Sequence, residues 1–326
     1  MAVSRVDQKQ MLAWAFEAQK WRFNRCLAPD MNCTAKAIQS HSIQNGRVLD
    51  LLVRDGHVKR IIPRVAKGGV EDHRPIILDF EDVGRNEAAT FHGLCAKHDA
   101  EIFKPIDIKP LSPNDPEQLF LLAYRAITRE LHTLMEGAAK IQSTYQRRIK
   151  IGWDTGNEPE PAGMAAIDHM IRAYTTYLYR QRFDEALLVG QYGTVLHDVI
   201  ELHHAQPTIA VCSLFSLDNV RREDDWLRVA LNLVPMNQTI SLAVFSYLPE
   251  DAPLARASLH PILNSVDDYQ KYTLSRLILN NCENFVISPT YYDTWTPAKR
   301  KFVAEYFIST LKTGNLDVES EHLYLF

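Results

Sequence analysis

The chain has 326 residues, of which 46% are hydrophobic and 23% charged, and its formal net charge at pH 7 is −4. This composition is typical of an ordered globular protein, and the length exceeds the size at which one hydrophobic core usually stops growing. No run of about 18 apolar residues occurs, and charges interrupt the apolar pattern of the N-terminus. We therefore expect a cytoplasmic protein of two domains, with no signal peptide, no contact with a membrane and reduced thiols.

Hydrophobic periodicity and turn residues predict the elements of the first part of the chain. In chain order they are a helix at 7–24, a basic hairpin at 47–66 around Asp55 and Gly56, a strand at 75–80, and a helix that begins near His98. The proline-rich stretch 105–116 is typical of a linker. We therefore divide the chain into domains at 1–110 and 111–326.

The second part is expected to be mainly helical at first and then to form an antiparallel sheet with helices behind it. The predicted elements are a helix at 117–150, one or two helices within 163–205, strands at 208–217, 226–236 and 239–248, helices at 267–280 and 297–312, and a short strand at the C-terminus. A residue among Ser112, Asn114 and Asp115 is expected to cap the helix at 117–150.

Basic residues are relatively more frequent in the first part. Residues 1–110 hold 17 Lys and Arg against 14 Asp and Glu, whereas residues 111–326 hold 19 against 26. The resulting balances of +3 and −7 permit a nucleic-acid contact at the N-terminal part without requiring one. Arg47, Lys59 and Arg60 of the predicted hairpin are the candidates for phosphate contact, and the alternative is that they are ordinary solvated charges.

Three of the five cysteines and one histidine fall in two short segments of the first part. Six residues separate Cys26 from Cys33, which is wider than the usual knuckle, and two residues separate Cys95 from His98 at the predicted start of a helix. Thiolates and imidazoles bind Zn²⁺ tetrahedrally, and a structural site needs four such ligands. The four residues therefore predict a structural zinc site, and the alternative is a set of buried free thiols.

The same segments resemble a divergent HNH nuclease domain, of the ββα-metal or treble-clef type. Residues 38–44 (IQSHSIQ) stand where the family has its H-x-I step, and residues 93–99 (GLCAKHD) stand where it has its L-C-x-x-C-H run. The resemblance covers about residues 20–105 and implies that His98 replaces the second zinc cysteine of that run. The fold class that follows is α+β, with a small zinc-stapled ββα domain, a mainly helical region, and an antiparallel sheet with C-terminal helices.

The resemblance implies catalytic roles for three residues. His41 would be the general base that activates water, and Asp99 would bind a catalytic Mg²⁺ or Mn²⁺ where the family has a histidine. Thr90 stands where the family usually has an asparagine that orients the catalytic histidine, and it reaches less far. The implied activity is metal-dependent cleavage of DNA or RNA, and the family's occurrence makes a role in antiviral defence or mobile elements an expectation.

Two alternatives to a nuclease remain open. The zinc domain could be a non-catalytic module that binds nucleic acid or a protein, because zinc-stapled folds also serve as scaffolds. It could also be accessory to an activity of residues 111–326. That part contains neither a glycine-rich phosphate loop nor a nucleophile elbow, so we expect it to be a regulatory or interaction domain with a protein partner.

One rival metal site occurs in the second part. His197, Glu201 and His204 fall at i, i+4 and i+7, which is one face of the helix expected within 163–205. Their order lacks the H-E-x-x-H arrangement of zinc proteases, so that chemistry is not indicated. The alternative interpretation is a polar stripe near the end of a helix.

Overall fold

The computed structural model is described for residues 21–65, 76–152, 161–221 and 226–326. Most of the helix predicted at 7–24 falls in residues 1–20, outside this described part. The chain combines long helices with antiparallel strands, which confirms the α+β class.

The strands form two sheets. Their bounds are β1 (Ser40–His41), β2 (His57–Val65), β3 (Ile76–Gly84), β4 (Thr90–Phe91), β5 (Leu196–His203), β6 (Ile209–Arg221), β7 (Trp226–Pro235), β8 (Ile240–Tyr247) and β9 (Phe285–Ile287). The main sheet has the order β3-β2-β9-β6-β7-β8-β5, and β1 pairs with β4 in a second, two-stranded sheet. All neighbours are antiparallel, and β3, β6, β7 and β8 confirm four predicted strands.

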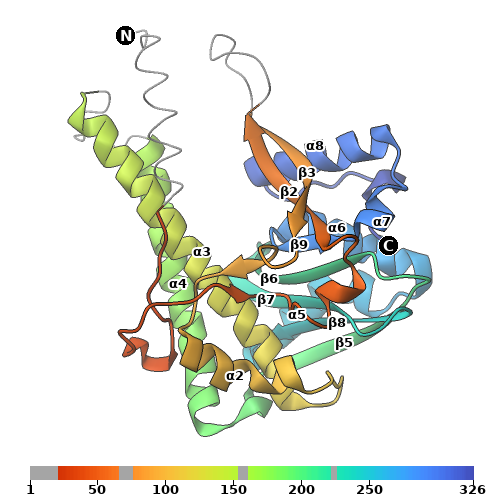
Figure 1. Ribbon diagram of the computed structural model, residues 1–326, viewed down its shortest axis with the longest axis horizontal. Helices are drawn as coiled ribbons and strands as arrows, with labels where there is room; N and C mark the ends of the chain where they lie inside the picture. Colours follow the sequence, from red (N-terminus) through yellow and green to blue (C-terminus); the bar gives the residue numbers. More distant parts are fainter. Residues whose placement is uncertain (1–20, 66–75, 153–160, 222–225) are drawn as a thin grey trace.

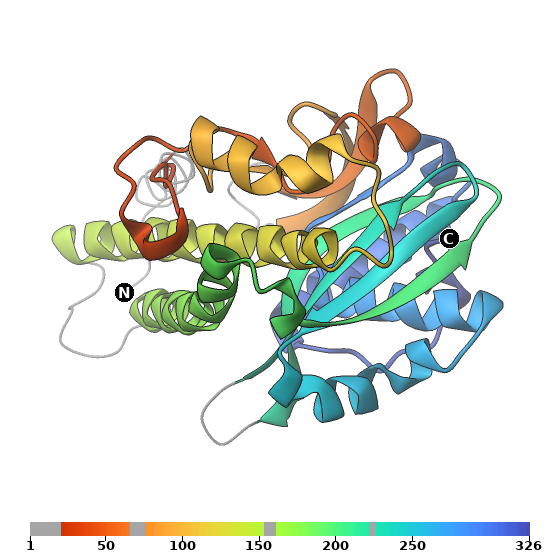
Figure 2. The same ribbon diagram turned by 90° about the horizontal axis from the view of Figure 1, so that it is seen from below.

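Helices cover both faces of the main sheet. Their bounds are α2 (Ala96–Ile108), α3 (Pro116–Lys150), α4 (Pro161–Val189), α5 (Ala252–Leu263), α6 (Asp267–Asn281), α7 (Pro289–Tyr292) and α8 (Pro297–Thr313). The long helices α3 and α4 lie side by side on one face, and α5 and α6 lie on the opposite face (Figures 1 and 2). The helices predicted near His98, at 117–150, at 267–280 and at 297–312 are confirmed.

Side chains of the main sheet alternate between two cores, as the period of two in a strand requires. Cys212 and Leu214 of β6 pack in the core that α3 covers, whereas Val211 and Phe215 pack in the core that α6 covers. Cys212 and Cys282 are both buried and pack in these two cores. The apolar sequence of β6 is thus explained by burial of both faces.

Asp115 caps the N-terminus of α3. Its Oδ1 accepts hydrogen bonds from the backbone N–H groups of Glu117, at 3.0 Å, and Gln118, at 3.2 Å. These N–H groups have no acceptor within the helix, so the cap satisfies groups that would otherwise depend on water.

Replacing Asp115 with alanine should therefore lower the free energy of unfolding by about 1 kcal/mol. The midpoint of urea denaturation measures this change, and Asn114→Ala at the exposed neighbouring position is the matched control. Equal shifts for the two variants would contradict a capping role for Asp115.

The prediction of a hairpin at 47–66 is wrong, although the predicted turn at Asp55 and Gly56 is present. Asp55 and Gly56 both have positive φ, at 51° and 75°, and the residues that flank them exchange two backbone hydrogen bonds of 3.0 Å. Glycine adopts such angles without steric cost, which explains its place in the turn. The arm that follows the turn is β2.

The arm before the turn is not a strand. Residues Leu49–Leu51 form a 3₁₀ turn, and the side chains of Leu49 and Leu52 are fully buried in the core beneath α3. Burial of these leucines outweighs the tendency of this arm to form a strand. β2 pairs instead with β3, along its whole length.

One or two helices are predicted within 163–205, and the described residues there form one α-helix, α4, followed by a strand. Gly190, with φ of 68°, follows the last residue of α4, and the residues beyond it form β5, which pairs with β8 along its whole length. His197, Glu201 and His204 therefore do not share a helix face. His197 Nδ1 bonds to Ser246 Oγ at 2.8 Å, and these three residues form no metal-binding cluster in the described part.

Two smaller predictions are also corrected. The C-terminal residues form no strand and instead contain a 3₁₀ turn at Glu321–Leu323. The stretch 105–116 is a linker only in part, because α2 continues through Pro105 to Ile108.

The main sheet includes strands from both sides of residue 110. β2 and β3 precede this position and the other strands follow it, with β2 joined to β9 at Lys59 and Ile287. The division into domains at 1–110 and 111–326 stays a prediction, and the two parts share one sheet.

Candidate metal centre

Cys26, Cys33, Cys95 and His98 come together at one point. One ligand atom from each residue lies within 4.8 Å of all the others. His98 Nδ1 is 3.3 Å from Cys26 Sγ and 3.5 Å from Cys95 Sγ. In a tetrahedral zinc site, bonds of about 2.3 Å to sulfur and 2.0–2.1 Å to nitrogen place these atoms about 3.6 Å apart. The cluster can therefore hold a metal ion, as the sequence predicts.

The start of α2 positions two of these ligands. Cys95 is the N-cap residue of α2 and His98 lies in its first turn, so the two-residue spacing directs both side chains to one point. The backbone N–H of Cys95 also donates to Cys26 Sγ at 3.2 Å. An N–H donor stabilises a thiolate at Cys26, which is the form that binds a metal.

The loop between Cys26 and Cys33 is shaped by backbone hydrogen bonds. Leu27 N donates to the carbonyl of Gly93 at 2.7 Å, and Cys26 N donates to that of Ala35 at 3.2 Å. The 3₁₀ turn Pro29–Met31 lies within the loop and shortens it. This turn explains how a spacing wider than the usual knuckle still brings both thiols to the cluster.

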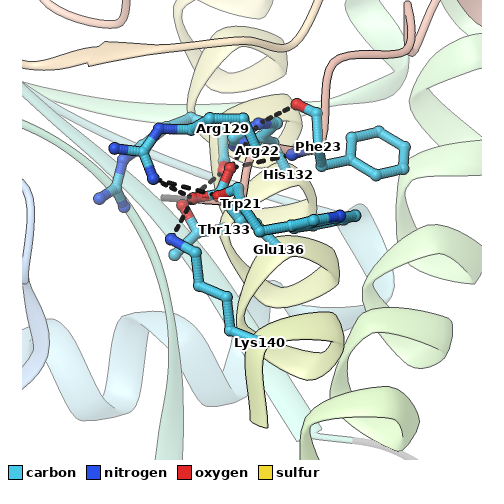
Figure 3. A network of polar contacts seen from close by, with 8 residues as sticks. All are labelled: Trp21, Arg22, Phe23, Arg129, His132, Thr133, Glu136 and Lys140. Atoms are coloured by element: carbon cyan, nitrogen blue, oxygen red, sulfur yellow. Dashed lines mark hydrogen bonds and ion pairs between the residues drawn. The ribbon is translucent and has the colours of Figure 1, made fainter. Parts of the chain in front are cut away.

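The segment before Cys26 is anchored on α3 (Figure 3). Phe23 N donates to Glu136 Oε2 at 3.1 Å, and His132 Nε2 bonds to the Phe23 carbonyl at 2.9 Å. A carbonyl can only accept, so His132 Nε2 carries the proton. Burial lowers the pKa of His132, which favours this neutral form. The backbone three residues before Cys26 is thereby held in place.

The residue after Cys26 is held by a buried polar cluster, here called the Arg180 cluster, of Arg180, Tyr124 and Asp184. Arg180 donates to the Leu27 carbonyl and, at 2.7 Å, to Tyr124 Oη. Asp184 Oδ1 accepts from Tyr124 Oη at 2.6 Å and lies 3.2 Å from Arg180 Nη2. Arg180 is fully buried, so its charge depends on Asp184 for compensation. α3, α4 and the loop of Cys26 are joined at this point.

The thiols of the cluster have different environments. Burial raises the pKa of Cys26 to about 11, whereas a hydrogen bond from the backbone of His98 lowers the pKa of Cys95. Cysteine binds a metal as the thiolate, so metal binding here releases protons. Metal affinity is therefore expected to fall as the solution is acidified.

Two of the three predicted catalytic residues are direct partners in the small sheet. His41 of β1 lies opposite Thr90 of β4. His41 Nε2 bonds to the Arg85 carbonyl at 3.1 Å, and because a carbonyl only accepts, Nε2 carries the proton of the neutral imidazole. Nδ1 of His41 is then the basic nitrogen, the atom able to take a proton from water.

The hydroxyl of Thr90 is directed elsewhere. It donates to the Glu87 carbonyl at 2.9 Å and accepts from Gln39 Nε2 at 3.1 Å. Thr90 therefore stabilises the turn before β4, and it faces His41 as a cross-strand neighbour rather than as a hydrogen-bond partner.

Asp99 follows His98 on α2 and is half-buried. Burial raises the pKa of its carboxyl, whereas Ser40, Arg125 and His41 lower it. His41 is thus one of the charges that act on Asp99. Arg125 is a neighbour that the sequence analysis missed, and the signal for it is a single charge in the apolar run of α3, LLAYRAI.

Comparison of the chain with known proteins finds no relative. The chain matches no protein-family model, no curated protein and no solved structure. None of the described helices is long and apolar enough to span a membrane.

The basic residues near β2 have partners within the chain. Lys59 Nζ pairs with Asp82 at 2.8 Å, and Arg47 donates to the Ile108 carbonyl. Burial lowers the pKa of Arg60, with a further contribution from Arg129. The contact of Arg47, Lys59 and Arg60 with phosphate stays a prediction, and these interactions would compete with it.

Proposed function

We propose that this chain is a metal-dependent phosphodiesterase of HNH type that cleaves DNA or RNA, with Zn²⁺ as the structural metal of the cysteine and histidine cluster. The arrangement of β1, β4 and α2 supports this proposal, because it combines two paired strands and a helix with a metal cluster at the start of the helix. The observation that carries it is the placement of His41 on β1 and of Asp99 in the first turn of α2, one residue past the cluster residue His98, with His41 among the charges that lower the pKa of Asp99.

The proposed roles follow from the chemistry of these two side chains. Nδ1 of His41 takes the proton from the attacking water, and the Arg85 carbonyl holds the ring through Nε2. Asp99 offers carboxylate oxygens, the ligands that Mg²⁺ and Mn²⁺ prefer. An ion bound there would supply charge stabilisation at the phosphate and at the leaving oxygen. The cluster at Cys26 holds the start of α2, the turn to which Asp99 belongs.

Replacing His41 with alanine should reduce cleavage at least about 100-fold, the typical contribution of a general base. The assay follows supercoiled plasmid and single-stranded RNA with Mg²⁺ or Mn²⁺, and elemental analysis follows zinc. His57→Ala is the matched control, because the His57 side chain is exposed and its one described hydrogen bond is to the neighbouring Asp55 carbonyl.

The proposal requires that His41→Ala keeps about one zinc per chain while losing cleavage. Unchanged cleavage in this variant would remove His41 from the mechanism. Cleavage that fails equally in His57→Ala would point to a general loss of fold.

A second candidate is a zinc-stabilised module that binds nucleic acid or a protein without catalysis. It is favoured by the contacts of Thr90, whose hydroxyl bonds to Glu87 and Gln39 and does not orient His41. Full zinc content with no cleavage in any metal would support it. In either case we propose a reducing, cytoplasmic location, since all five cysteines are free, and a role in antiviral defence or mobile elements remains an expectation from the resemblance.

A further inference from the structure

A cavity of about 230 Å³ lies between the segment after β1, the end of α2, α3 and the main sheet. Its walls are mostly apolar, with contributions from Ile43, Leu122, Val211 and Met236. The four metal ligands, His41 and Asp99 are not among the described residues that line it. The cavity is therefore a separate place in the fold.

Two residues that line this cavity each have a buried donor without a partner in the described chain. Arg125 is 3% exposed and Asn232 is 2% exposed, and both side chains line the cavity. Arg125 Nε and Asn232 Nδ2 form no hydrogen bond within the described chain. A buried N–H group without an acceptor is costly, and native proteins rarely leave two in one place without a purpose. Both groups require an acceptor, which an oxygen atom of a ligand can provide.

The charge of the lining has one sign. Arg47, Lys109 and Arg125 line the cavity, and no Asp or Glu is found among its described lining residues. Arg125 is partly compensated by Asp107, whose Oδ2 accepts from Nη2 at 2.7 Å, outside the lining. Arg125 remains positive beside the apolar walls, where electrostatic attraction is weakly screened.

We propose that this cavity binds a small organic anion, whose carboxylate or phosphate oxygens accept hydrogen bonds from Arg125 and Asn232. The apolar part of the ligand packs against Ile43, Leu122 and Met236. The volume lies below the about 300–1,000 Å³ of sites for drug-sized ligands, so the ligand is a small metabolite rather than a polymer. This binding does not depend on the nuclease activity.

Calorimetric titration with charge-matched pairs tests the proposal. Benzoate is compared with neutral benzamide, and phenyl phosphate with phenol, at one salt concentration. At least one anion should bind, and at least tenfold more tightly than its neutral counterpart. The anion that binds more tightly distinguishes a carboxylate ligand from a phosphate ester. No measurable binding by either anion, or equal binding by the neutral compounds, overturns the proposal.

Two variants locate the binding in this cavity. Asn232→Asp places a negative charge at the ligand oxygen and should weaken the anion at least tenfold, whereas Arg182→Gln removes an exposed surface charge and should not. Met236→Trp fills the cavity from its half-buried edge and should abolish binding, and Met236→Leu should retain it. If Asn232→Asp does not fold, Met236→Trp and Met236→Leu still test whether the anion binds in this cavity. Anion affinity unchanged in Met236→Trp overturns the assignment to this cavity.

Discussion

Cys95→Ser should lose the bound metal and most of the folded structure around it. Cys95 stands at the N-cap position of α2 and offers its thiol to the cluster, whereas its backbone N–H, which donates to Cys26 Sγ, is retained by serine. In zinc-finger peptides the apparent binding free energy of a structural Zn²⁺ is about 10–16 kcal/mol, and it contributes directly to folding. We expect a loss of at least several kcal/mol of unfolding free energy here, together with loss of the ordered start of α2.

Elemental analysis and circular dichroism measure these two effects. The wild-type chain should carry about one metal ion and the variant almost none, and a chelator should reproduce the variant's spectrum in the wild type. Cys282→Ser is the matched control, since Cys282 is also buried but belongs to the core of the opposite face. Full metal content in Cys95→Ser would show that the cluster is not a metal site.

Arg180→Met should destabilise the chain by about 3–5 kcal/mol, the usual cost of removing one partner of a buried ion pair. The substitution removes the charge beside Asp184 and the donors to Tyr124 and to the Leu27 carbonyl. Because Leu27 follows Cys26, the loop of the metal cluster should also loosen, and metal should be released at a lower chelator concentration.

Arg182→Met is the control that separates the loss of a buried ion pair from the loss of an exposed one. Arg182 is two residues away on α4 and pairs with Glu250 at 3.0 Å, but its side chain is 54% exposed. Exposed ion pairs contribute about 0–1 kcal/mol, so this variant should unfold close to the wild type. Equal destabilisation of the two variants in urea would contradict the role given to the Arg180 cluster.

The metal cluster could be predicted from the sequence because its signal is local. Two residues between Cys95 and His98, at the start of a helix, are enough to bring both side chains together. The buried strands β6, β7 and β8 were also predictable, since a strand buried on both faces reads as an apolar run.

β5 could not be predicted from its own residues. Its sequence, LHDVIELH, has polar residues at spacings that suit a helix, and only pairing with β8 makes it a strand. Edge strands have one paired neighbour and less burial, so their apolar pattern is weak. The partner of β2 was missed for a similar reason, because pairing with β3 and β9 is decided by residues distant in sequence.

The partners of Arg125 at the candidate site also could not be predicted, because they are distant from it in sequence. An arginine in an apolar helix face indicates a buried partner, but not which one. Only the packed chain brings Arg125 to Asp107 and Phe103, with its guanidinium 4.1 Å from the centre of the Phe103 ring. Its proximity to Asp99 and to the cavity is a property of the assembled layers.

The position of β9 in the main sheet has a consequence for the order of folding. β2 and β3 are synthesised early and can pair with each other, but in the described part of the chain β2 joins the rest of the sheet through β9, near the C-terminal end. Asn284, just before β9, also donates to Ser42 Oγ at 2.9 Å. Contacts of such long sequence separation form late and slowly. The edge of β2 that pairs with β9 therefore stays unpaired until nearly the whole chain has been synthesised. A fragment that ends at residue 110 should aggregate through this edge, so cleavage assays require all 326 residues.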